Sequence, residues 1–109
     1  MAEPTLTSVF GNGANQDINT LTISKSALAN VGLTAAADNT AESLFAAILK
    51  IAANTLTAEQ QQLNADQHAS VQIANSTVYS SPFGQRFRHN FLVSFDDPFV
   101  DPGVNPDNY

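Results

Sequence analysis

His89 is the side chain of this sequence best suited to proton transfer, because histidine titrates near neutral pH. It lies among Phe87, Phe91 and Val93 in a run of alternating residues. General base catalysis or ligand binding would need a second group beside it, such as a serine, a cysteine or another histidine. The sequence places none there, so we interpret His89 as a core or interface histidine. His68 lies in a polar stretch and is predicted to be solvated.

Aspartate is concentrated in the last fourteen residues, DDPFVDPGVNPDNY, at Asp96, Asp97, Asp101 and Asp107. Carboxylate oxygens are the ligands that Ca²⁺ prefers. The spacing does not match an EF-hand loop, which also needs an internal glycine and a closing glutamate. We therefore predict an acidic docking tail here, with no metal site and no cofactor site.

Arg86 and Arg88 are separated by one residue and are predicted to share the outward face of a strand. Guanidinium groups bind phosphates and carboxylates, so the pair could hold an anionic ligand or the acidic tail of a neighbouring copy. Alternatively, the two charges are solvated and keep an edge strand from aggregating. The sequence leaves both interpretations open.

Apolar side chains near both ends of the chain are predicted to contact a partner. Each proline of the C-terminal segment fixes its own φ and disfavours helix at the preceding residue. The segment should therefore be extended, without a core of its own, and should be ordered by contact with another molecule. Its predicted anchors are Phe99, Val100, Val104 and Tyr109, and Phe10 is the anchor predicted in the N-terminal arm.

Composition argues against several classes of protein. The formal net charge is −6 with only four basic residues, which disfavours nucleic acids and anionic membranes as partners. The absence of cysteine excludes disulfides, thiol catalysis and thiolate metal sites. No secretory signal or membrane span is predicted. Charged residues make up 13% of the chain against a typical figure of about 25%, so neutral polar groups cover the surface and can be buried against a partner.

The clearest helix signal covers residues 40–54, where apolar residues recur at helical spacing after a predicted N-cap at Asn39. Residues 25–32 are predicted to form a helical turn that Gly32 ends. Residues 56–69 fit a short helix and a surface loop equally well. The glycine- and asparagine-rich segment 11–17 is predicted to be a loop.

Three segments are predicted to be strands, at residues 18–24, 71–79 and 86–95. The last two should pair as an antiparallel hairpin, because Ser81-Pro-Phe-Gly84 between them is a turn sequence. Phe87, Phe91 and Phe95 fall on one face of the last strand and are predicted to pack on the main helix.

The predicted fold is therefore α+β, with a small three-stranded antiparallel sheet, one main helix on one face, and extended arms at both ends. Residues 1–17 form the N-terminal arm and loop, residues 18–95 the core domain, and residues 96–109 the acidic C-terminal arm.

Several short segments resemble short uncharacterised proteins of cyanobacteria and their tailed phages. They are Phe10-Gly-x-Gly13, Leu21-Thr-Ile-x-Lys25, Asn39-Thr-Ala-Glu-Ser-Leu44 and the closing Asn105-Pro-Asp-Asn-Tyr109. The resemblance covers most of the chain but includes no functional motif, so it assigns no residue a role. It implies a virion or phage-derived particle as the context.

These observations predict a structural virion protein and not an enzyme. The leading hypothesis is a capsid cement or decoration protein, assembled in the host cytoplasm, whose arms staple neighbouring capsid subunits. Its partners would be other protein subunits, in a homo-oligomer or a symmetric assembly. The alternatives are a tail or neck adaptor of a phage particle and a small cytoplasmic binding module.

Overall fold

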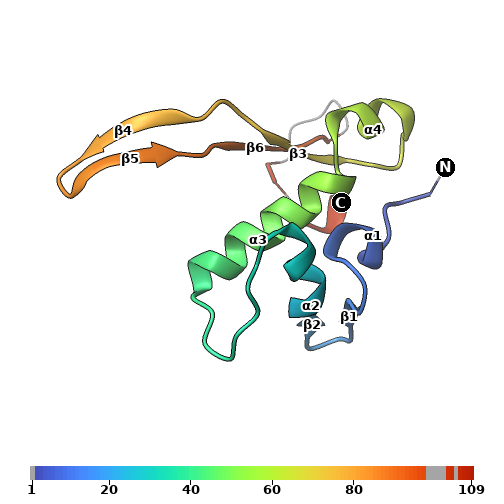
Figure 1. Ribbon diagram of the computed structural model, residues 1–109. Helices are drawn as coiled ribbons and strands as arrows, with labels where there is room; N and C mark the ends of the chain where they lie inside the picture. The colour runs from blue at the N-terminus through green and yellow to red at the C-terminus, as the bar shows by residue number, and fades with distance from the viewer. Residues whose placement is uncertain (1, 98–102, 105) are drawn as a thin grey trace.

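The structure is a computed structural model that describes residues 2–97, 103–104 and 106–109. It confirms the α+β class, with one main helix and antiparallel strand pairs (Figure 1). The helical elements are α1 (Leu6–Phe10), α2 (Lys25–Leu28), η1 (Ala29–Val31), α3 (Ala41–Thr55), α4 (Ala58–Leu63) and η2 (Pro106–Asn108). The strands are β1 (Asn15–Gln16), β2 (Leu21–Thr22), β3 (Ala69–Ile73), β4 (Thr77–Ser81), β5 (Gly84–Arg88) and β6 (Phe91–Phe95).

The main helix, α3, begins one residue later than the sequence predicts. Thr40 is its N-cap, and the Thr40 hydroxyl accepts a hydrogen bond of 3.1 Å from the Ser43 backbone N–H. The prediction of Asn39 as the cap is therefore wrong. The Asn39 side chain is occupied elsewhere, since its oxygen accepts from the Ala36 N–H and its nitrogen donates to the Thr34 carbonyl, both at 3.0 Å.

Two shorter helical segments flank α3. The predicted turn over residues 25–32 is confirmed as α2 and η1, which end at Gly32 with a φ of 106°. Of the two alternatives for residues 56–69, the short helix is present as α4. The Thr57 hydroxyl caps it by accepting from the Gln60 N–H at 3.0 Å.

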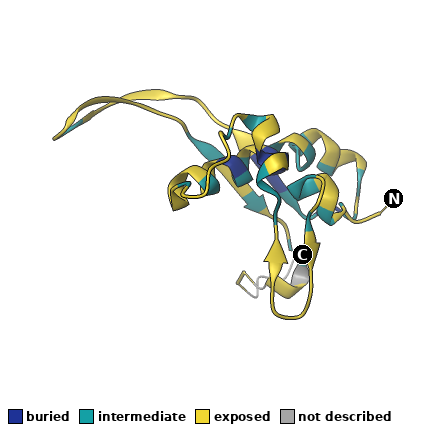
Figure 2. Ribbon diagram, turned by 60° about the horizontal axis from the view of Figure 1, so that its bottom comes forward, coloured by how far each residue is buried: buried dark blue, intermediate teal, exposed yellow. Residues whose placement is uncertain are grey.

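The hydrophobic core lies between α3 and the segment α2–η1 (Figure 2). Its buried members are Ala27, Leu28, Ala47 and Ile51, with Ile23, Val31, Leu33, Leu44 and Ile48 packed against them. The apolar stripe of α3 therefore packs on the N-terminal half of the chain. The prediction that Phe87, Phe91 and Phe95 pack on this stripe is wrong, and the Phe87 side chain is 63% exposed.

The N-terminal segment does not extend away as an arm over residues 6–10, because these residues form α1 and pack against α3. The Thr55 hydroxyl of α3 donates a hydrogen bond to the Ser8 carbonyl. Gly11 ends α1 with a φ of 92° and brings the backbone against the side chains of Ala27 and Ile51. This close contact joins the start of the chain to the core.

The predicted three-stranded sheet is wrong, because the strands form three separate antiparallel pairs. β2 pairs with β1 and not with the later strands. A local turn explains this pairing: the Asp17 carboxylate accepts hydrogen bonds of 2.8 Å from the N–H groups of both Asn19 and Thr20. These hydrogen bonds lower the pKa of Asp17, and the bond from Asn19 has the largest effect.

Strands β3 to β6 form one long two-stranded ribbon over residues 69–95, which confirms the predicted hairpin. We call the β3–β6 pair its root and the β4–β5 pair its tip. In the root Ile73 lies opposite Phe91, and in the tip Thr77 lies opposite Arg88. Three residues, 74–76, therefore face two residues, 89–90, which makes a one-residue bulge between root and tip.

The ribbon extends well beyond the rest of the molecule, which we call the body (Figure 1). The radius of gyration is 16.0 Å, against about 13 Å for a compact chain of this length. The largest dimension of the molecule is 44 Å. The tip of the ribbon is consequently covered by no other described element.

Candidate protein-interaction surface

The outer face of the ribbon tip carries both arginines of the chain. Arg86 lies opposite Tyr79 and Arg88 opposite Thr77, so the pair shares one face, as the sequence predicts. The Arg88 guanidinium lies 3.8 Å from the centre of the Tyr79 ring, and that of Arg86 lies 6.0 Å from the Phe83 ring centre. Stacking on Tyr79 holds the Arg88 cation along the strand while leaving it accessible, and Arg86 lies at the outer limit of a cation–π contact.

The face of the tip opposite the two arginines, which we call the inner face, is apolar, and no other described element covers it. Val78 lies directly opposite Phe87, and both side chains are more than 60% exposed. Phe83, in the turn at the end of the ribbon, is 85% exposed. These exposed apolar groups make the tip a candidate contact surface.

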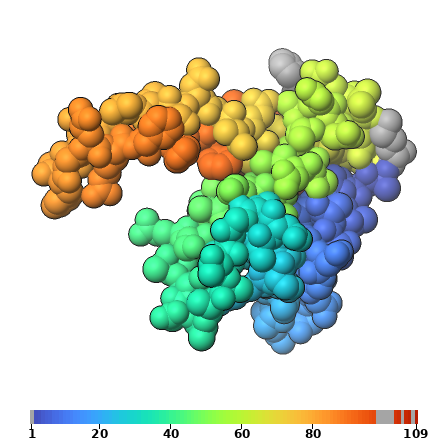
Figure 3. Space-filling view, viewed as in Figure 1, coloured from blue at the N-terminus to red at the C-terminus, as the bar shows by residue number. Residues whose placement is uncertain are grey.

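A cleft of about 290 Å³ lies where the ribbon root meets α3. Its wall combines three apolar side chains with an ammonium group and an imidazole, and the lining residues are Ala46, Lys50, Ile73, His89 and Phe91. Figure 3 shows the ribbon overhanging the body with an open hollow between them. The cleft therefore lies at the junction between the ribbon and the body.

The ribbon bulge places a serine beside His89, which sequence reasoning missed. The Ser76 hydroxyl lies 3.4 Å from His89 Nδ1, and both residues are exposed. A working nucleophile and base need a distance of about 2.6–3.2 Å and a third group that orients the base. Among the described residues no carboxylate is hydrogen-bonded to this imidazole. The pair therefore has the geometry of a surface contact.

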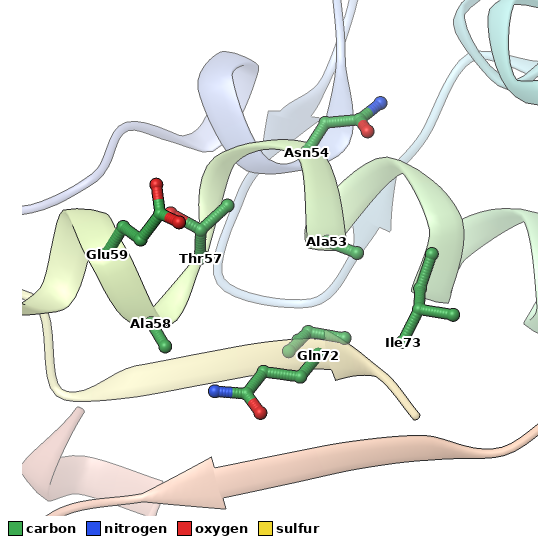
Figure 4. A pocket seen from close by; sticks show the side chains of 8 residues that line it. Ala53, Asn54, Thr57, Ala58, Glu59, Gln72 and Ile73 are labelled. Atoms are coloured by element: carbon green, nitrogen blue, oxygen red, sulfur yellow. The ribbon is translucent and has the colours of Figure 1, made fainter. Parts of the chain in front are cut away.

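A second depression, of about 430 Å³, lies between the end of α3, the start of α4 and residues 71–73 of β3 (Figure 4). Ala53, Ala58, Val71 and Ile73 contribute its apolar wall. Among the described residues that line it, Glu59 is the only one that ionises near neutral pH. The depression thus lacks a pair of groups for acid–base chemistry.

The described part of the C-terminal segment folds back against the ribbon root and does not extend from the molecule as an arm. The Tyr109 ring packs on Phe95 with 5.0 Å between ring centres, and its hydroxyl donates a 2.9 Å hydrogen bond to Asp97. At the start of the segment, the Asp96 N–H donates to the His68 carbonyl at 2.8 Å, and the Asp96 carboxylate accepts from the Gln61 amide at 2.7 Å. Both ends of the segment are thus fixed at the ribbon root.

This contact predicts a pH limit for the docking of Tyr109. The pKa of Tyr109 is raised above its usual value of 10.0. Desolvation of the hydroxyl is the largest cause, and the hydrogen bond to negatively charged Asp97 is the next. The neutral phenol is the form that docks, so the contact is fully present below pH 10 and is lost as the pH rises through the raised value. In a Tyr79→Phe variant only Tyr109 ionises as a phenol, and we expect its absorbance titration to have a midpoint above that of the same variant in urea. Equal midpoints would contradict the contact.

The residues predicted to bind a partner do not form one surface. Arg86 and Arg88 lie at the ribbon tip and Tyr109 at the root, roughly 30 Å away along the strand. Phe10 is half-buried in α1, whereas the Val104 side chain is 73% exposed. Phe99 and Val100 lie outside the described residues.

His68 also differs from its prediction. Its Nδ1 atom is buried and has no hydrogen-bond partner among the described residues, so the side chain is not fully solvated. The Gln67 side chain beside it is 5% exposed and donates to the carbonyls of Thr57 and Ala69 at 3.0 and 2.9 Å. These bonds hold the loop after α4 against the ribbon root.

Within residues 2–97, 103–104 and 106–109, no helix is both long and apolar enough to cross a bilayer, and no three acidic or histidine side chains are grouped as metal ligands would be. Comparisons of the chain with protein-family models, curated proteins and solved structures give no match. The exposed ribbon, with its apolar inner face and cationic outer face, is therefore the strongest candidate for a functional surface.

Proposed function

We propose that this chain is a structural assembly protein that binds other protein subunits through its ribbon. The observation that carries the proposal is the uncovered tip, where Val78, Phe83 and Phe87 are all more than 60% exposed. An isolated two-stranded hairpin is only marginally stable in water, and it gains stability when a further surface covers its apolar face. A partner subunit would supply that surface.

The specific role that we propose is that of a capsid cement or decoration protein of a tailed phage or related particle. The virion context comes from the sequence resemblance described above, and the ribbon supports a contact function. Because many copies would each bury a ribbon tip across a joint between capsid subunits, the shell would be stabilised by mass action. In this arrangement the ribbon makes the main contact, in place of the C-terminal arm that the sequence suggested.

The test uses purified phage particles that contain this chain. Particles stripped of it are mixed with the full-length protein or with a Val78→Ser/Phe87→Ser variant, and bound copies per particle are measured by quantitative mass spectrometry. We expect the variant to bind at least about tenfold more weakly, because two apolar side chains leave the contact. A Leu63→Ser variant is the matched control, since Leu63 on α4 is as exposed as Phe87, at 63%. Full attachment of the ribbon variant would contradict the proposal.

Copy number separates the two virion roles. A cement protein is present at a fixed ratio to the capsid subunits, whereas a tail or neck adaptor is present at the number of a single ring. The same mass spectrometry therefore decides between them.

A small binding module is the second candidate function, and the cleft of Lys50 and His89 favours it. An ammonium and an imidazole set in an apolar wall suit a small anion that has an apolar part. The test is thermal unfolding with a series of medium-chain carboxylates, with the Lys50→Gln variant as the control. A ligand-dependent rise in melting temperature that this substitution abolishes would support this function.

A further inference from the structure

Charge is divided unevenly between the ribbon and the rest of the chain. The ribbon, residues 69–95, contains Arg86 and Arg88 and no aspartate or glutamate, so its formal charge is +2. The whole chain has a formal charge of −6, so the remainder has −8. The ribbon is thus a cationic arm on an acidic protein.

The acidic residues include a group at the opposite end of the molecule from the ribbon tip. This acidic end consists of Glu3, Glu59, Asp66, Asp96 and Asp97, around α4, the N-terminal residues and the ribbon root. The Asn64 side chain donates to the Ala2 carbonyl at 2.8 Å and the Gln61 amide to Asp96 at 2.7 Å, so these segments lie side by side. Figure 1 shows α4 and the N-terminus at one side and the β4–β5 tip at the other.

The two charged regions of one molecule are too far apart to neutralise each other. Arg86 and Asp96 are separated by ten residues of nearly extended chain, or roughly 30 Å. The Debye length at physiological ionic strength is about 8 Å. Arg86 and Arg88 make no ion pair with any described carboxylate of their own chain and contact aromatic rings.

We propose that the ribbon tip of one copy binds the acidic end of a second copy, so that the protein associates with itself head to tail. This inference rests on the proposed assembly function and divides the tip between two contacts: the apolar face with Val78 and Phe87 is left for the capsid subunit, and the cationic face binds the second copy. Charge complementarity selects the contact, since two ribbons would bring four arginines together, whereas ribbon and acidic end attract. Because the two surfaces differ, each copy can bind a neighbour on both sides, which gives a ring or a chain of subunits.

The first test measures molecular mass by sedimentation velocity over a range of protein and salt concentrations. We expect the mean mass to rise with protein concentration at low salt and to fall back to the monomer at high salt, because exposed charge pairs are screened. A monomer at every concentration would overturn the proposal. An oligomer that salt strengthens would also overturn it, because apolar ribbon-to-ribbon contact behaves that way.

The second test blocks each surface separately by neutral substitution. An Arg86→Gln/Arg88→Gln variant has a blocked ribbon, and a Glu59→Gln/Asp66→Asn variant has a blocked acidic end. We expect each variant alone to associate at least about tenfold more weakly than the original chain, because the charge pairs of the contact are lost together. An equimolar mixture should form a one-to-one dimer that grows no further, since one intact ribbon meets one intact acidic end.

Controls separate this contact from changes in net charge or folding. An Ala35→Glu/Ala37→Glu variant, changed at two exposed positions outside both surfaces, alters the net charge of the chain by the same amount as the arginine variant and should associate like the original chain. Circular dichroism and thermal unfolding confirm that every variant is folded. If the variant with the blocked acidic end still associates fully, or the mixture forms no dimer, the head-to-tail arrangement is wrong.

These tests need no phage particle, so the inference and the proposed function can fail separately. Particle attachment without self-association would refute the inference alone. Head-to-tail self-association without particle attachment would refute the cement role alone.

Discussion

Replacing Leu28 by alanine is expected to destabilise the protein by about 3–5 kcal/mol, the usual range for emptying a fully buried leucine site. Leu28 is the most deeply buried large side chain among the described residues, with only 2% of its surface exposed. Two of the other buried members of the core, Ala27 and Ala47, have side chains too short to fill the cavity. Domains of this size have total stabilities of about 5–15 kcal/mol, so the loss would be a large part of the whole.

The measurement is urea unfolding followed by far-ultraviolet circular dichroism. Leu63→Ala removes the same atoms from α4, where the leucine is 63% exposed, and should change the free energy of unfolding by less than about 0.5 kcal/mol. If the two variants lost similar stability, the core would not lie between α2 and α3.

Replacing Gly11 by alanine is expected to cost about 2–6 kcal/mol, because two independent penalties add. At a φ of 92° and a ψ of 172° the backbone of Gly11 lies in a region essentially restricted to glycine, and a residue with a side chain pays about 1–3 kcal/mol to adopt it. The added Cβ would also lie 2.5 Å from Ala27 Cβ and 2.8 Å from Ile51 Cδ1. Overpacking of this kind costs about 1–3 kcal/mol, and here it would push α1 away from the core.

Gly84→Ala is the matched control for this second prediction. Gly84 has a similar φ of 111°, but a Cβ there would meet nothing within 4 Å. It should therefore show only the conformational penalty, about 1–3 kcal/mol. Equal losses in the two variants, measured by urea unfolding, would mean that α1 does not pack against α2 and α3 as described.

Patterns within a single element were predictable from the sequence. The spacing of Leu44, Ile48 and Ile51 defines α3 because packing on one side of a helix requires that period. Alternation and the turn at Ser81–Gly84 define the hairpin for a similar reason. The N-cap was misplaced by one residue because Asn39 and Thr40 are both good caps, and only the contacts of the preceding loop decide between them.

Relations between elements were not predictable in this way. Alternation shows that Phe87, Phe91 and Phe95 share a face, but it does not show whether anything covers that face. The proximity of Ser76 to His89 depends on the bulge, and that of Tyr109 to Phe95 depends on the path of the intervening chain. For the candidate site, the sequence correctly placed Arg86 and Arg88 on one face, but it did not predict that the whole tip would stand clear of the body.

The alternation of side chains between the two faces of the ribbon limits how the length of this hairpin can change during evolution. Because side chains alternate between faces, inserting one residue in each strand would turn the Val78–Phe87 pair toward the side that Arg86 and Arg88 now occupy. Inserting two in each strand would lengthen the hairpin and keep every side chain on its present side. Homologous chains that differ in this region by four residues should therefore keep their apolar and basic positions, and those that differ by two residues, one in each strand, should have them exchanged.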